Sequence, residues 1–267
     1  MFERILVALD ESAPTDALLC ATMAVARPYR TCVTLVSVRQ GPHPLPEAGV
    51  LELAAKRLRL ADYRAVVAVR VPAGGGGVAD ELIRSIDDLK PDLVVMGSRG
   101  LSDLRALIVG SVSHRVLSHA GCPILIVRGD PKLEAPKRLL LAFDDSRHSQ
   151  RAARVAIDLA KATGAEIEVV SISQPLISEV AITNNDDSAR RRVAELVATL
   201  RSEVNASGSV KVTASGKAAA IAQTAEQSGS DMIVMGTRGL SRIAGAVIGS
   251  VSHEVIHLSH RQVLLVP

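Results

Sequence analysis

Short apolar runs alternate along this chain with longer stretches in which apolar residues recur at helical spacing. In the first half the apolar runs cover residues 5–9, 32–38, 66–71, 93–96 and 124–127. Helical patterns cover residues 13–26, 51–60 and 78–89, and a fourth begins at Ser111. Continuous apolar strands separated by helices are typical of a parallel sheet with both faces covered. The first half is therefore predicted to be an α/β domain.

The second half repeats this order of strands and helices. Its apolar runs cover residues 139–143, 167–172, 210–214, 232–235 and 263–266. Its helical patterns cover residues 150–161, 187–204 and 218–227, with a fourth before the last strand. A stretch at 130–136 with two prolines and mixed charge is typical of a linker. We predict two tandem doubly wound α/β domains, at 1–130 and 137–267, each with a five-stranded parallel sheet.

A twenty-residue stretch occurs once in each half. GSRGLSDLRALIVGSVSHRV starts at Gly97 and GTRGLSRIAGAVIGSVSHEV starts at Gly236, and both keep the spacing G-x2-G-x9-G-S. Each copy follows a predicted strand and leads into a predicted helix. A glycine turn followed by a serine at a helix start suits phosphate binding, because free backbone N–H groups and the helix dipole attract an anion.

The repeated stretch predicts a nucleotide site, and two arginines in it, Arg99 and Arg238, could add charge-assisted contacts to phosphate. Glycines in such turns also serve close packing alone, and this alternative remains open. Asp10 and Asp144 each follow the first strand of their half, where they could accept hydrogen bonds from ribose or adenine or cap the next helix. His114 and His253 lie one turn into the following helices, where partly buried structural histidines are commoner than general bases.

Other site classes are not supported by the sequence. The Walker and dinucleotide glycine patterns are absent, and no metal-ligand cluster or nucleophile elbow stands out, so we expect no metal site and no catalytic residue. The net charge of +3 is spread over both halves and aromatic residues make up 1% of the chain, which disfavours nucleic-acid binding. Three scattered cysteines do not form a disulfide framework, and no leader or membrane span is evident, so we expect a cytoplasmic protein.

The glycine spacing resembles that of the universal stress protein family. The resemblance is carried by residues 7–12 (VALDES), 97–113 and 122–127 (CPILIV), with matching segments in the second half. It implies an adenine nucleotide alpha hydrolase-like α/β fold with strand order 3-2-1-4-5, and membership of the ATP-binding subgroup. It also implies that the final strands, 124–127 and 263–266, pair within one chain as a pseudo-dimer, with a homodimer as a further option.

The resemblance also implies site residues in both halves. In the first half they are Asp10, Val38, Gly97, Arg99, Gly100, Gly110, Ser111, Val112 and Ser113. In the second half they are Asp144, Ile172, Gly236, Arg238, Gly239, Gly249, Ser250, Val251 and Ser252. The cofactor implied is ATP, with or without Mg²⁺. The second half departs from the pattern after its last helix, where HLSHRQVLLVP lacks the glycine and proline of SHAGCPILIV, so the turn there is expected to differ.

Three functions are consistent with the sequence. The first is an ATP-binding regulatory protein of the stress response, in which occupancy is the signal. The second is a slow ATPase, with loop serines and arginines stabilising the leaving phosphate. The third is an interaction scaffold that needs no nucleotide. Two glycine loops without an evident catalytic group favour the first.

Overall fold

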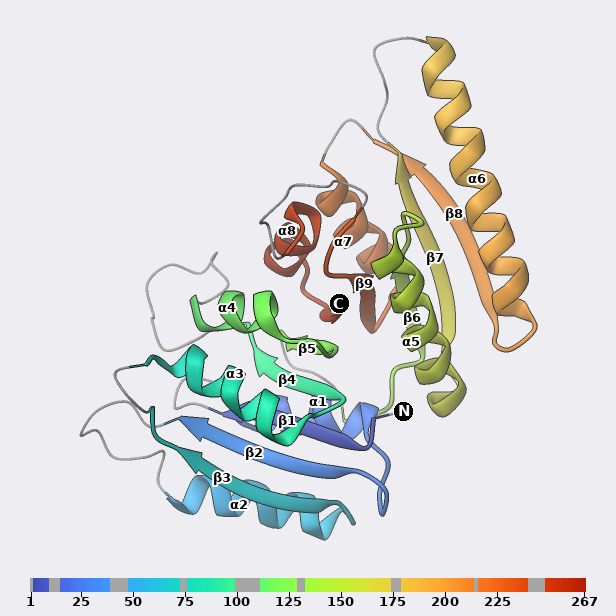
Figure 1. The fold of residues 1–267 in the computed structure, drawn as a ribbon. Helices are drawn as coiled ribbons and strands as arrows, with labels where there is room; N and C mark the ends of the chain where they lie inside the picture. Colours follow the sequence, from blue (N-terminus) through green and yellow to red (C-terminus); the bar gives the residue numbers. More distant parts are fainter. Residues whose placement is uncertain are drawn as a thin grey trace. The chain divides into compact units, whose positions relative to one another are not determined.

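A computed structural model describes residues 2–9, 15–38, 48–72, 76–98, 111–128, 133–173, 179–213, 216–239 and 248–267. The chain divides into two compact units, Met1–Ala135 (unit 1) and Pro136–Pro267 (unit 2). Within each unit, strands and helices alternate from beginning to end (Figure 1).

Unit 1 has five strands and four helices among its described residues. The strands are β1 (Arg4–Leu9), β2 (Cys32–Val38), β3 (Arg64–Arg70), β4 (Leu93–Gly97) and β5 (Ile124–Val127). The helices are α1 (Thr15–Val25), α2 (Ala48–Leu60), α3 (Val78–Leu89) and α4 (Ser111–His119). The strands lie in the order β3-β2-β1-β4-β5, and all of these pairs are parallel.

Unit 2 repeats this arrangement. Its strands are β6 (Arg138–Ala142), β7 (Glu166–Ser173), β8 (Ala206–Val212), β9 (Met232–Gly236) and β10 (Gln262–Val266). Its helices are α5 (Arg147–Thr163), α6 (Glu179–Arg201), α7 (Lys217–Gln227) and α8 (Ser250–Leu258). The order β8-β7-β6-β9-β10 is again parallel throughout. The predicted fold class and strand order are confirmed.

The core of each unit is aliphatic, as expected from a chain with few aromatic residues. The central strands are almost completely buried, including Leu6 and Val7 of β1 and Leu139, Leu140 and Leu141 of β6. Both faces of such a strand are covered, because successive side chains point to opposite sides of the sheet. Among the described residues, no helix combines the length and apolar character needed to cross a membrane.

The largest differences from the predicted bounds are at the starts of α6 and β8. Helix α6 covers Glu179–Arg201, whereas the apolar stripe in the sequence predicted a helix over 187–204. Strand β8 begins at Ala206 rather than 210, through the small residues before Val210. Gly208 explains this second difference: a Cβ there would lie 2.7 Å from side-chain atoms of Val193 and Val197, so α6 packs directly on the strand backbone. Tertiary packing outweighs local propensity in β8.

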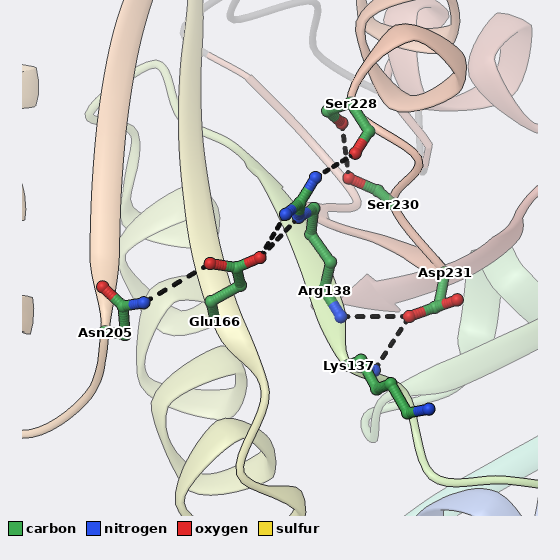
Figure 2. Close-up of polar contacts among 7 residues, drawn as sticks. All are labelled: Lys137, Arg138, Glu166, Asn205, Ser228, Ser230 and Asp231. Carbon is green, nitrogen blue, oxygen red and sulfur yellow. Dashed lines mark hydrogen bonds and ion pairs between the residues drawn. The ribbon is translucent and has the colours of Figure 1, made fainter.

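An aspartate joins the amino ends of two strands in each unit. Asp92 accepts backbone N–H groups from Glu3 and Arg4 at 2.8 and 3.0 Å, and Asp231 does the same for Lys137 and Arg138 at the same two distances. In unit 2 the Arg138 side chain also contacts Glu166 and the Ser228 carbonyl, as Figure 2 shows. These contacts fix the amino edge of the sheet.

The turn after α8 differs from its counterpart after α4, as the sequence predicted. Ser259 ends α8, and its hydroxyl accepts the Arg261 N–H at 2.9 Å just before β10. A serine side chain thus orders a turn that has Gly121 and Pro123 in unit 1.

Candidate functional site

A cavity of about 160 Å³ opens in unit 2 at the carboxyl ends of β6, β7 and β9. In open parallel sheets this edge is where ligands bind, beside the strands at which the order reverses. Strand β6 lies between β7 and β9, so the cavity is at that reversal point.

All nine residues that the resemblance implied for the second half line this cavity: Asp144, Ile172, Gly236, Arg238, Gly239, Gly249, Ser250, Val251 and Ser252. They come from the end of β6, the end of β7, the loop after β9 and the start of α8. The rest of the lining consists of residues that the sequence did not single out: Ala142, Phe143, Ser149, Val170, Lys217, Ile221 and Met235.

The first turn of α8 lines the cavity. Gly249 is the N-cap, and it supplies no side-chain cap. The first N–H groups of a helix have no partner within the helix, so Ser250, Val251 and Ser252 present donors at the positive end of the helix dipole. Ser250 is exposed, which leaves its hydroxyl accessible from the cavity mouth. This is a helix start suited to an anion.

The second serine of the pattern has a structural bond. The buried Ser252 hydroxyl donates to the Gly236 carbonyl at 2.8 Å, joining α8 to the end of β9. Ser113 makes the same bond to the Gly97 carbonyl at 3.2 Å in unit 1. Each hydroxyl therefore holds the helix start against the strand end, and the first serine of each pair is the better candidate for a ligand contact.

The loop glycines allow close packing within the protein. A Cβ on Gly236 would lie 2.6 Å from the Cβ of His148 and 2.9 Å from the backbone nitrogen of Ser149. A Cβ on Gly239 would lie 2.6 Å from Asp144 Oδ2. Among the described glycines, Gly164 and Gly229 have a positive φ. Gly236 and Gly239 do not, so their backbone conformation does not require glycine. Both glycines therefore allow close packing, and that packing shapes the cavity wall.

Backbone hydrogen bonds close the two ends of the glycine loop. Thr237 N–H donates to the Val266 carbonyl at 2.8 Å, and Gly249 N–H donates to the Thr237 carbonyl at 2.7 Å. The Ser146 hydroxyl donates to the Arg238 carbonyl at 3.3 Å. The loop is thus held to β10, to α8 and to the start of α5.

Of the two roles that the sequence left open for Asp144, the capping role is taken by Ser146. Ser146 caps α5, because its hydroxyl accepts the Ser149 N–H at 3.2 Å. Asp144 accepts the Ser146 N–H at 3.1 Å through Oδ1, while Oδ2 faces Gly239 at the cavity wall. The carboxylate is oriented by the turn before α5 and lines the cavity without capping that helix.

Cationic side chains surround the cavity mouth. Lys217, the first residue of α7, and Arg238 both line the cavity and are exposed. The pKa of His148, on the first turn of α5, is lowered, chiefly by burial and further by Arg151 and Arg238, against an opposing effect of Asp144. The lowered pKa favours the neutral form of His148, and the positive charges of Lys217 and Arg238 favour an anionic ligand.

The sequence contains a signal that could have identified Lys217 as a site residue. The helix after β8 starts at the same carboxyl edge as the glycine loop, because all the strands are parallel. A lysine directly after Gly216 at that helix start lies at this edge. The strand order was needed to connect the two segments.

The corresponding site of unit 1 is only partly described. Asp10, Arg99, Gly100 and Gly110 lie outside the described residues. Val38 ends β2, Gly97 ends β4, and Ser111, Val112 and Ser113 form the first turn of α4. Ser98 N–H donates to the Val127 carbonyl at 3.2 Å, which matches the bond from Thr237 to Val266 in unit 2.

Comparison with known proteins gives consistent matches. The family model described as "Universal stress protein family" matches residues 1–128 and again 136–267. A universal stress protein of Thermus aquaticus is 36% identical over 135 residues, covering 49% of this chain and 98% of the relative. One of Mycolicibacterium smegmatis is 28% identical over 287 residues, covering 98% of this chain and 96% of the relative. For three other mycobacterial relatives, the match covers 61% of their own length.

Among solved structures, a universal stress protein from Archaeoglobus fulgidus aligns over 98% of this chain and 97% of its own. The TM-score is 0.73 and the sequence identity is 22%, so the likeness establishes the fold.

Proposed function

The chain belongs to the universal stress protein family, and on that premise we propose that the cavity of unit 2 binds an adenine nucleotide, with ATP as the principal ligand. Nucleotide occupancy is then the signal that the protein contributes to a stress response. One observation carries the proposal: the nine residues implied by the resemblance, distant in sequence, line one cavity with the uncapped start of α8.

The cavity lining suits the three parts of a nucleotide. Val170, Ile172 and Ile221 give an apolar wall for a purine ring. The Asp144 carboxylate is an acceptor for a ribose hydroxyl or an adenine amine. The start of α8, with Lys217 and Arg238 at the mouth, would hold the phosphates.

Mg²⁺ would enter this site on the phosphates. Among the described residues, no group of three or more histidine, cysteine or acidic side chains could hold a metal by itself. Mg²⁺ is commonly held by substrate phosphates and water with few protein ligands, so the chain fits ATP with or without Mg²⁺. A second nucleotide is proposed for unit 1, held by Asp10, Val38 and the loop from Gly97 to Ser113.

Isothermal titration of the untagged, nucleotide-free protein with ATP tests the proposal. The double variant Gly110→Val, Gly249→Val is expected to lose binding. In unit 2 a Cβ on Gly249 would already lie 3.3 Å from the Thr237 carbonyl, and a branched side chain would open that closing bond. Gly121→Ala is the control, because a Cβ there meets nothing within 4 Å. Equal binding by the double variant and the wild type would contradict the proposal.

The other two functions make different predictions in the same samples. A slow ATPase releases phosphate in proportion to protein, and this release disappears in the double variant. A nucleotide-independent scaffold carries no nucleotide after purification and binds none in the titration. The pairing of the two final strands as a pseudo-dimer, and a homodimer, stay predictions.

A further inference from the structure

Two histidines on α8 direct the same ring atom toward each other. His253 and His257 are four residues apart, so they lie on one face of the helix. Their Nε2 atoms are 3.4 Å apart and their ring centroids 4.5 Å apart, with the ring planes inclined at 61°. Both residues are partly exposed, so an ion in water can reach them.

The separation of the two nitrogens matches that of two ligands on one metal ion. Zinc binds imidazole nitrogen at about 2.0–2.1 Å, and two nitrogens 3.4 Å apart at that distance subtend an angle of about 110° at the metal, close to tetrahedral. Imidazole nitrogen suits Zn²⁺, Cu²⁺, Ni²⁺ and Co²⁺ and does not suit Mg²⁺ or Ca²⁺. Without a metal ion this contact is a hydrogen bond in which one Nε2 carries the proton. Metal binding replaces it, because both Nε2 atoms must then be unprotonated, with each ring proton on Nδ1.

The surrounding sequence has the form H-E-x-x-H, from His253 to His257. In metalloproteases, the glutamate of this motif serves as the general base. Here Glu254 lies beside the start of α7, where a Cβ on Gly216 would be 3.9 Å from Glu254 Oε1. Among the described residues, no third histidine, cysteine or acidic ligand joins the pair. The arrangement supports metal binding with water in the remaining positions and gives no support for peptide hydrolysis.

The pair is a feature of unit 2. His114 occupies the position of His253 in the repeated stretch, but Ser118 occupies that of His257. The Ser118 hydroxyl donates to the His114 carbonyl at 2.8 Å. The two units therefore differ at one ligand position, which gives a natural control.

We propose that His253 and His257 form a two-histidine site on α8 for a first-row transition-metal dication, with Zn²⁺, Ni²⁺, Co²⁺ and Cu²⁺ as the class of ligand. This site does not depend on nucleotide binding, because His253 and His257 are not among the residues that line the described cavity. The proposal differs from the expectation from the sequence that no metal site is present, and the titration below decides between the two.

The test is titration of the untagged full chain with Zn²⁺ and with Co²⁺, without nucleotide, because phosphates chelate both ions. We expect the wild type to bind one ion, and to bind it more tightly than His257→Ser, the change that reproduces the unit 1 residue. The affinity should fall about tenfold or more when the second imidazole is removed. His260→Asn is the matched control, since His260 is exposed and lies outside the pair.

Two further readouts separate a metal site from a structural histidine contact. Affinity for Zn²⁺ should fall as the pH is lowered, because protons compete with the metal for imidazole nitrogen. Zn²⁺ should raise the thermal unfolding midpoint of the wild type and leave that of His257→Ser unchanged. Equal affinity in the wild type and His257→Ser, loss of binding in His260→Asn, or no binding by the wild type would each overturn the proposal.

Discussion

Individual residues around the unit 2 cavity control the position of one carboxylate. Asp144 is oriented by the Ser146 N–H on one side and faces Gly239 on the other. A methyl group on Gly239 would therefore meet the flexible end of the Asp144 side chain before it meets any backbone. The second glycine of the pattern thus keeps the carboxylate in place.

Gly239→Ala is expected to weaken ATP binding by about tenfold with little change in stability. The added Cβ would come within 2.6 Å of Asp144 Oδ2, and rotation of the side chain relieves the overlap while removing the proposed nucleotide contact. One charge-assisted hydrogen bond corresponds to about 1.5 kcal/mol, close to a tenfold effect. Titration measures the ATP affinity of Gly239→Ala and thermal unfolding measures its stability, with Gly121→Ala as the control in both experiments. Unchanged affinity would show that Asp144 does not contact the ligand.

Lys217→Gln is expected to reduce ATP affinity more than AMP affinity. The ammonium group at the mouth of the cavity attracts the phosphate chain, and its loss should cost about threefold to tenfold at low salt and less at high salt. Lys211→Gln removes the same charge from an exposed residue of β8 that does not line the cavity. If both variants bind ATP with the same affinity, Lys217 acts only through the net positive charge of the protein and makes no contact with the phosphates.

His148 predicts a pH dependence of stability. Burial lowers the pKa of this imidazole in the folded protein below its ordinary value, so the unfolded chain takes up the proton first. The stability from neutral His148 is complete above about pH 6.5 and is lost as the pH falls through the lower folded pKa. Thermal unfolding midpoints of the wild type and His148→Gln should therefore converge as the pH is lowered below 6.5. If the difference between the two midpoints stays constant over this pH range, His148 does not contribute to the pH dependence of stability.

At the scale of elements, the contact between α8 and β9 determines where the helix start lies. The Ser252 hydroxyl bonds the last carbonyl of β9, and the Gly249 N–H bonds the Thr237 carbonyl. Together these bonds hold the N–H groups of α8 at the strand edge. The same serine bond in unit 1 indicates that both helix starts are positioned alike.

Ser252→Ala is expected to destabilise the protein by about 1 kcal/mol, because it leaves a buried carbonyl without its donor. Ser250→Ala is the matched control: this hydroxyl is exposed, so its loss should leave the unfolding free energy unchanged within about 0.5 kcal/mol. Denaturant unfolding of the two variants gives the comparison. Equal stabilities would show that the Ser252 bond contributes nothing net.

For the whole molecule, the duplication predicts two nucleotides per chain. Each unit has its own glycine loop, its own strand order and its own helix start. Gly110→Val or Gly249→Val alone should therefore halve the stoichiometry of ATP binding, and titration of each single variant measures it. A single variant that abolishes all binding would indicate one functional site.

The alternation of apolar runs and helical patterns was enough to predict both α/β units. Strands such as β6 and β9 are buried on both faces, and a strand buried in this way appears in the sequence as a continuous apolar run. The repeated glycine spacing similarly marked the segment from β9 to α8. Patterns that depend on local periodicity or on repetition are readable without a structure.

Other features depend on residues that are distant in the sequence. The reason for Gly239 is the Asp144 carboxylate, and the reason for Gly208 is the valine pair of α6. Lys217 joins the cavity only because β8 and β9 are parallel in one sheet. His253 and His257 were visible as a spacing, but the convergence of their Nε2 atoms is a matter of side-chain geometry. The sequence determined the elements and the repeated glycine spacing, whereas packing between elements decided which side chains share a site.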